Sequence, residues 1–116
     1  MSQRFPLWQL MTGRQFNELS KGMRFYKLTT ANELHRGFLY RDGLNVDTER
    51  FVALPHNPGL HFTEESMIAS WVDIFNGLGT PLKWKREVKI ADDAKVYYQF
   101  DQFKADQLIL SPREEL

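Results

Sequence analysis

The chain of 116 residues has 42% hydrophobic and 14% aromatic side chains, no cysteine, and fifteen basic residues that balance fifteen acidic ones. This length and composition fit one globular domain and exclude a disordered chain. The lack of cysteine excludes disulfides, thiolate zinc sites and cysteine nucleophiles, and zero net charge provides no overall field to attract nucleic acid or an acidic membrane. The sequence predicts neither a signal peptide nor a membrane-spanning segment, so we expect an intracellular, cytoplasmic protein with no membrane partner.

Residues 1–22 are predicted to form an arm with a short helix, ahead of a single domain at residues 23–116. Thr12 and Gln15 have the spacing of a capping box at the start of that helix. The arm also carries large apolar side chains that need a cover, either the body of the domain or a partner protein or second copy of the chain. These side chains are Trp8, Leu10 and Met11.

Short runs of alternating β-forming residues predict five to six strands. The runs are MRFYKLT, GFLYRDGL, LHF, LKWKREVKI, KVYYQF and DQLIL. Between them, TANELH is predicted to form a helical turn and residues 45–58 a long loop, and SPREEL is expected to be a polar tail. Loops of that length in a small domain are often functional, and this one carries Phe51.

The segment PGLHFTEESMIASW predicts a strand followed directly by the main helix. Thr63 is a suitable N-cap, and Glu64 and Glu65 occupy the first turn, where the helix dipole favours anions. An apolar stripe at helical spacing follows, made of Met67, Ile68, Trp71, Val72, Phe75 and Leu78. We therefore expect an α+β fold in which a small, mostly antiparallel sheet of five to six strands packs against one main helix at about 64–76.

The three histidines, His35, His56 and His61, are one candidate for a zinc site. Their spacing has no diagnostic pattern, and an exposed loop position or local hydrogen bonds explain them better. We therefore predict no metal at the histidines.

Oxygen-bearing side chains in and after RDGLNVD are compatible with calcium; they are Asp42, Asn45, Asp47 and Glu49. Their spacing is not that of an EF-hand. Hydrogen bonds from Asp and Asn side chains to nearby main-chain groups, which stabilise turns, explain the stretch more simply. No metal is predicted here either.

Four segments, FYKLT, HRGFLYRDGLNVD, PGLHFTEE and REVKIADDAKVYYQFDQFKADQLIL, span residues 23 to about 111. Their series resembles the N-terminal module of ankyrin-repeat proteins from mimivirus-like giant viruses. The matching positions are Tyr40, Asp42, Gly43, Leu44, Asn45, Asp47, Gly59, Leu60, Phe62, Arg86, Glu87, Asp92, Ala94, Val96, Lys104, Ala105 and Asp106. The resemblance implies a viral origin, or that of a host or bacterium sharing the module, with the virion or host cytoplasm as its location. It implies no activity.

The order of the strand FYKLT, the strand GLHF that runs into a helix, and the late strand KADQLIL is similar to that in ADP-ribosyltransferases. This resemblance implies that Lys27 takes a position usually held by Arg or His, and that Asp106 takes that of a catalytic Glu. Because Asp is a methylene shorter than Glu, a catalytically silent relative is the stronger expectation. The implied NAD pocket includes Gly59, Leu60, His61 and Thr63, and Tyr97 is added because one of the neighbours Tyr97 and Tyr98 must point away from the core.

The sequence thus predicts a non-catalytic binding or assembly module without a cofactor, which contacts a protein partner or a second copy of itself. The expected contacts are the arm, through Trp8, Leu10 and Met11, and the 45–58 loop, through Phe51. The alternative is an ADP-ribosyltransferase-like NAD-binding domain or enzyme that uses Lys27, His61 and Asp106. A third possibility is a nucleic-acid binder that uses the basic strand at 83–89, with Lys83, Lys85 and Lys89.

Overall fold

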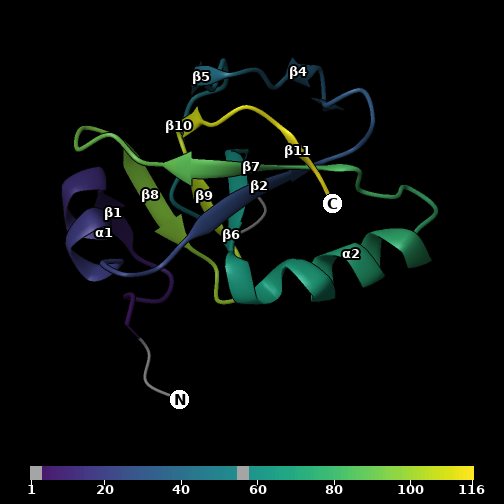
Figure 1. Ribbon diagram of the computed structural model, residues 1–116. Coiled ribbons are helices and arrows are strands. Elements are labelled where there is room, and N and C mark those ends of the chain that lie inside the picture. Colours follow the sequence, from purple (N-terminus) through teal and green to yellow (C-terminus); the bar gives the residue numbers. More distant parts are fainter. Residues whose placement is uncertain (1–3, 55–57) are drawn as a thin grey trace.

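The computed structural model describes residues 4–54 and 58–116, and its main element is a nine-stranded sheet (Figure 1). Its strands are β1 (Leu10–Thr12), β2 (Phe25–Thr29), β5 (Gly43–Val46), β6 (Leu60–Glu64), β7 (Trp84–Lys89), β8 (Lys95–Tyr98), β9 (Phe103–Ala105), β10 (Gln107–Leu110) and β11 (Glu114–Glu115). They follow the order β1-β8-β9-β6-β2-β7-β10-β5, with β11 paired to β7, and all pairs are antiparallel. A separate hairpin is formed by β3 (Leu34–His35) and β4 (Phe38–Leu39).

Two α-helices and one 3-10 turn accompany the sheet: α1 (Gly13–Leu19), η1 (Glu65–Met67) and α2 (Ile68–Gly77). The Thr12 hydroxyl accepts a hydrogen bond from the main-chain N–H of Gln15 at 3.0 Å, which confirms the predicted cap of α1. Within the described residues, neither helix has the length and apolar run that crossing a bilayer requires.

The predicted fold class is wrong. The structure is dominated by a nine-stranded antiparallel sheet, not by five to six strands packed against one main helix. Strands of two or three residues such as β1, β9 and β11 are too short to produce a recognisable alternation, and β1 and β11 form because distant segments pair with them. The helix α2 contains no buried residue, so the core is built without it.

The joint between sheet and helix also differs from the prediction. Thr63 lies inside β6 and does not cap a helix, because Glu64 continues the strand and occupies the N-cap position of η1. The segment predicted as a helical turn at 30–35 ends in β3, and the first residues of the predicted 45–58 loop belong to β5. Residues 55–57 of that loop, including His56, lie outside the described part of the chain.

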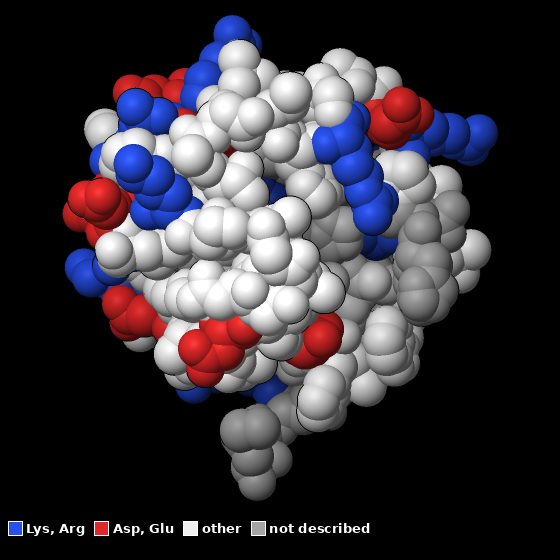
Figure 2. Space-filling model, turned by 90° about the vertical axis from the view of Figure 1, so that its right-hand side faces the viewer, with Lys and Arg blue, Asp and Glu red and all other residues white. Residues whose placement is uncertain are grey.

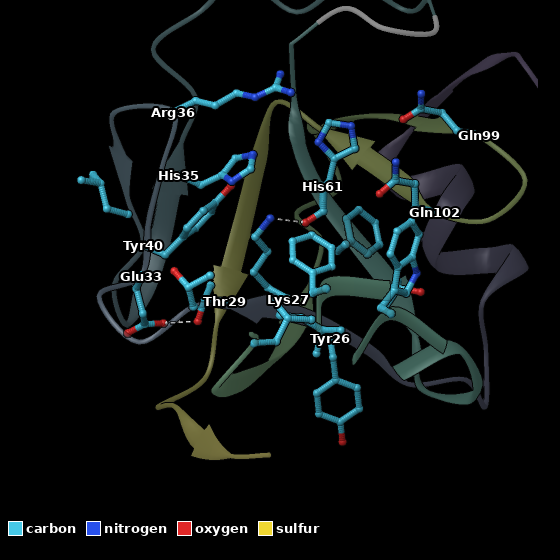
Figure 3. Close-up of a pocket in the computed structure, with 18 residues that line it drawn as sticks. Tyr26, Lys27, Thr29, Glu33, His35, Arg36, Tyr40, His61, Gln99 and Gln102 are labelled. Carbon is cyan, nitrogen blue, oxygen red and sulfur yellow. Dashed lines mark hydrogen bonds between the residues drawn. The ribbon is translucent and has the colours of Figure 1, made fainter. Parts of the chain in front are cut away.

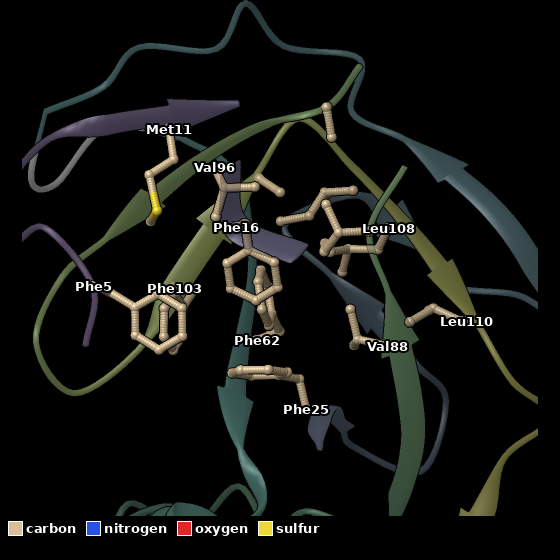
Figure 4. Packing of buried hydrophobic residues seen from close by; sticks show 14 of the residues in the cluster. Phe5, Met11, Phe16, Phe25, Phe62, Val88, Val96, Phe103, Leu108 and Leu110 are labelled. Carbon is tan, nitrogen blue, oxygen red and sulfur yellow. The ribbon is translucent and has the colours of Figure 1, made fainter. Parts of the chain in front are cut away.

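The core is a cluster of phenylalanine rings contributed by segments far apart in sequence (Figure 4). Phe62 of β6 stacks on Phe103 of β9 with 5.2 Å between ring centroids, and Phe16 of α1 lies 4.9 Å from Phe25 of β2. Phe5 completes the cluster at 5.0 Å from Phe103. Aromatic pairs in such geometry contribute roughly 0.5–1.5 kcal/mol each beyond the burial of their area.

The arm therefore has part of its cover within the molecule, although Trp8 and Leu10 stay exposed. Phe5, Met11 and Phe16 all belong to the core, and Met11 is only 1% exposed. Strand β1 adds the arm to the sheet, with Leu10 opposite Tyr97 of β8. Residues 4–22 are thus continuous with the domain at 23–116.

A buried ion-pair network explains why Arg86 falls on the apolar side of β7. Its guanidinium makes two hydrogen bonds of 2.8 Å to the carboxylate of Glu33 and a further one to Asp42. It also donates to the main-chain carbonyl of Ser111 at 3.0 Å. The side chain of Asn45 bonds the main chain of Arg41 and Gly43, as expected for a turn-stabilising residue. The segment RDGLNVD is therefore held by structural hydrogen bonds.

Candidate ligand pocket

A pocket with a volume of about 450 Å³ lies between β2, β6, the β3–β4 hairpin and α2 (Figure 3). This volume falls within the range of roughly 300–1,000 Å³ that is typical of small-molecule sites. Adjacent strands supply the floor, because β2 and β6 pair with Tyr26 opposite Thr63. The half-buried face of α2 supplies one wall through Trp71 and Phe75.

Lys27 lies at the centre of this pocket although it is only 7% exposed. Its Nζ donates a hydrogen bond of 2.7 Å to the main-chain carbonyl of His61 and lies 4.5 Å from the centroid of the Tyr40 ring. It forms no ion pair with any carboxylate of the described residues. Burial without such a partner lowers the pKa of Lys27 to about 7, so the amine is partly neutral at physiological pH.

Two histidines on either side of Lys27 are neutral at physiological pH (Figure 3). Burial, reinforced by the charges of Lys27 and Lys104, lowers the pKa of His61 to about 4. Burial, followed by the charges of Lys27 and Arg36, also lowers the pKa of His35. Each ring therefore presents one donor and one acceptor nitrogen to its surroundings.

The Tyr40 hydroxyl is held in its protonated form. Burial raises the pKa of Tyr40, and the negative charge of Asp47 adds to that effect. The phenol is thus available as a hydrogen-bond donor beside Lys27.

Cations outnumber free carboxylates in the lining of the pocket. Lys27 and Arg36 carry the positive charge, and Glu33 is the single carboxylate among the described residues that line it. The Arg86 guanidinium beside Glu33 is the main reason that the pKa of this carboxyl is lowered. Because Glu33 is already neutralised by Arg86, the pocket favours an anion.

Three buried polar atoms in the described residues have no hydrogen-bond partner. They are the Thr63 hydroxyl oxygen, the Trp71 indole nitrogen and the amide oxygen of Gln99. All three residues line the pocket. Leaving such a group without a partner costs about 1–3 kcal/mol, so the pocket wall carries unused donors and acceptors.

The structure brings together some of the residues predicted for an NAD pocket and separates others. Lys27, His61 and Thr63 line the pocket. Leu60 and Tyr97 are buried away from it, and a side chain on Gly59 would meet the Lys104 Cδ at 2.8 Å.

Asp106 does not share the pocket with Lys27 and His61. Its carboxylate accepts a hydrogen bond of 2.8 Å from the main-chain N–H of Lys95, next to strand β10. The proposed trio of Lys27, His61 and Asp106 therefore does not meet in one cleft.

The residues predicted to contact a protein partner are divided in the same way. Trp8 and Leu10 are 49% and 53% exposed beside β1, the terminal strand of the sheet. Met11 is buried in the core, as described above. Phe51 is half-buried, with the Lys104 Nζ 5.6 Å from its ring centroid.

The basic strand at 83–89 is interleaved with acidic and aromatic groups. The Lys83 and Lys85 amines lie over the rings of Trp84 and Tyr26, and Glu114 of β11 is the strand partner of Lys85. Figure 2 shows that, on the face it presents, acidic and basic atoms are mixed around a broad uncharged band.

Sequence reasoning missed much of the pocket wall, including Tyr40, Trp71 and Gln99. The sequence pattern predicts an apolar stripe that includes Trp71 and Phe75, and such a helix face looks the same whether it covers a core or a cavity. The sequence does contain one signal for the pocket: Lys27 is a charged residue within a run of apolar and β-forming residues. Among the described residues no group of three or more potential ligands is placed to hold a metal ion.

No protein-family model matches the chain, and no solved structure matches it. The resemblances to giant-virus modules and to ADP-ribosyltransferases therefore stay predictions. Any assignment of function depends on the geometry of the pocket.

Proposed function

We propose that this protein is a small-molecule binding module whose ligand carries an anionic group and a flat ring. One observation carries the proposal: the three buried polar atoms without a partner, at Thr63, Trp71 and Gln99, all belong to residues that line the pocket. Folded proteins leave few buried polar atoms in that condition. A polar ligand that enters the pocket supplies the missing partners, after a small shift of the side chains that now cover these atoms.

The preference for an anion follows from the lining charges. Lys27 and Arg36 are not matched by a free carboxylate, since Glu33 is engaged by Arg86. A charged hydrogen bond in a partly desolvated site contributes about 1.5–3 kcal/mol. A phosphate or carboxylate group in the part of the pocket lined by Lys27 and Arg36 is therefore the expected anchor.

The preference for a flat ring follows from the aromatic wall. Trp71 and Phe75 lie 6.3 Å apart between ring centroids on the inner face of α2, and neither side chain is fully buried. Aromatic faces exposed in a concave site favour stacking with planar ligands.

NAD and ADP-ribose combine these features, and the resemblance of the strand order to ADP-ribosyltransferases makes them the first ligands to test. We expect binding without transfer of ADP-ribose. Asp106, the residue that the resemblance offers as the catalytic carboxylate, lies outside the pocket. A transferase needs a carboxylate within reach of the sugar, and Glu33 is occupied by Arg86.

The test is calorimetric titration of the purified protein with NAD and with ADP-ribose, repeated with Lys27→Met. We expect saturable binding that the substitution weakens by roughly 10-fold or more. Asp106→Asn is the matched control, because it changes a carboxylate outside the pocket and should leave the affinity unchanged. Absence of saturable binding by either nucleotide, with no response to other phosphorylated aromatic compounds, contradicts the proposal.

A second candidate, association with a protein partner or a second copy, is favoured by the exposed edge of β1. Trp8 and Leu10 present apolar surface at β1, which is the last strand at one end of the sheet. The outer side of such an edge strand can pair with another chain. Removing residues 1–22 is not a clean test because Phe5, Met11 and Phe16 belong to the core. The double substitution Trp8→Ser and Leu10→Lys is better, and light scattering should report loss of any dimer if this edge associates.

A further inference from the structure

We propose that Lys27 captures an aldehyde or ketone group of its ligand as a reversible Schiff base. The inference rests on the proposed function, because it uses the same pocket and adds a covalent bond to the binding event. It is carried by the position of the Lys27 amine, its hydrogen-bond partner and the groups that surround it.

The Lys27 amine is held without being fixed in its charged form. Its hydrogen-bond acceptor is the main-chain carbonyl of His61 at 2.7 Å, which accepts a hydrogen bond from a neutral amine as well as from an ammonium. A carboxylate in that place would retain the proton. Since no carboxylate of the described residues pairs with Lys27, the amine can lose its proton and keep its position.

Burial supplies the nucleophilic form. Burial lowers the pKa of Lys27 to about 7, so the amine is partly neutral at neutral pH. An ordinary lysine with a pKa near 10.4 is neutral for well under about 1% of the time. Desolvation of a lysine in an apolar pocket is an established way to make it reactive toward carbonyl groups.

Groups that could take up or donate the protons of this reaction lie on both sides of the amine. The lone pair of Lys27 Nζ attacks the carbonyl carbon, and the carbonyl oxygen takes up a proton to give a carbinolamine. The nitrogen then loses a proton, a second proton passes to the hydroxyl so that it leaves as water, and the nitrogen lone pair forms the C=N bond of a protonated Schiff base. His35 and His61 are neutral and flank the amine, and the protonated Tyr40 phenol can donate (Figure 3).

The chain contains a second buried lysine that serves as an internal comparison. Lys104 is 0% exposed, and its Nζ donates to the main-chain carbonyl of Leu54 at 2.6 Å. Burial lowers the pKa of Lys104 as well. It does not line the pocket, so a small carbonyl compound has no route to it comparable to that at Lys27.

Pyridoxal 5′-phosphate is a suitable probe because it combines an aldehyde, an aromatic ring and a phosphate. The full-length protein is mixed with less than one equivalent of probe, reduced with borohydride to trap the imine, and digested for peptide mapping. We expect Lys27 to be labelled at least about 10-fold faster than any exposed lysine, given its larger neutral fraction. Labelling spread over Lys21, Lys83 and Lys89 with Lys27 unmodified overturns the proposal.

Two further measurements separate this inference from the proposed function. Pyridoxine 5′-phosphate has an alcohol in place of the aldehyde, so it can bind but cannot form an imine. If it binds saturably while pyridoxal 5′-phosphate gives no trapped adduct, the binding module stands and the Schiff base is overturned. Failure of both compounds to bind or react overturns the Schiff base and counts against the proposed anion-binding pocket. Lys27→Arg keeps the positive charge but cannot form an imine, so it should still bind pyridoxine 5′-phosphate and lose the trapped adduct.

Discussion

Arg86 and Glu33 form a two-pronged ion pair that joins the middle of β7 to the turn before β3, with both N–O distances at 2.8 Å. Both side chains are 5% exposed, and Thr29 and Arg113 add further hydrogen bonds to the carboxylate. Glu33 also lines the pocket, so the pair fixes one of its lining residues in place.

Replacing Arg86 with Met should destabilise the protein by about 3–5 kcal/mol, because Glu33 is then left buried with only the more distant Arg113 as a charged partner. Urea unfolding measures the effect. Arg24→Met is the matched control, since Arg24 is exposed and its contact to Glu87 is 3.9 Å long, so the expected cost is about 0–1 kcal/mol. Equal losses of unfolding free energy in the two variants would show that the buried pair contributes no more to stability than the exposed contact.

Lys27→Met should stabilise the protein at pH 6 and lose that advantage as the pH rises. The folded pKa of Lys27, about 7, lies below the unfolded value of 10.5, so the unfolded chain binds more protons between these values and stability rises with pH there. Below pH 7 the full cost of burying the ammonium is present, on the order of a few kcal/mol, and above about 10.5 it has gone. The difference in unfolding free energy between wild type and variant, measured at several pH values, isolates this group. A difference that does not change with pH would mean that Lys27 keeps an ordinary pKa.

Thr63→Val should make the protein more stable and a weaker binder. The Thr63 hydroxyl is buried without a partner among the described residues, and valine has nearly the same shape, so the expected gain is roughly 1 kcal/mol. Thr29→Val is the matched control because the Thr29 hydroxyl donates to Glu33 at 2.9 Å, and its removal should lower stability. Thermal melts and ligand titrations of both variants check the opposite signs.

Gly13→Ala should be strongly destabilising, while Gly77→Ala should be neutral or favourable. A Cβ on Gly13 would lie 1.8 Å from the main-chain oxygen of Ala91, whereas one on Gly77 would meet nothing within 4 Å. We expect a loss of about 3 kcal/mol or more for the first and a gain of up to about 1 kcal/mol for the second, because Gly77 is helical. The melting temperatures of the two variants should therefore move in opposite directions.

The sequence predicted best those elements that local chemistry determines. The cap at Thr12, the side-chain turn at Asn45 and the strongly alternating strand at 84–89 are all present. The arrangement of short strands was not predictable, because β1 depends on a partner far along the chain and β9 joins its neighbour β8 to the distant β6. The amphipathic pattern of α2 carried no information on whether its apolar face covers a core or borders a cavity.

The candidate site was predicted only in part, and for a related reason. Lys27, His61 and Thr63 were singled out by the resemblance to ADP-ribosyltransferases, and the structure places them on the paired strands β2 and β6. Tyr40 and Gln99 reach the pocket from connecting segments. No local sequence pattern indicates which strand such a segment will pack against. The same resemblance also selected Asp106, but this residue lies outside the pocket. Its carboxylate binds a neighbouring main-chain amide.

The pairing of β1 with β8 affects the order in which the sheet can form. Leu10 and Met11 meet Tyr97 and Val96, and Phe5 meets Phe103, so this segment is synthesised well before the residues that cover it. Pairings of such long sequence separation slow folding, so we expect the addition of β1 to the sheet to be a late step.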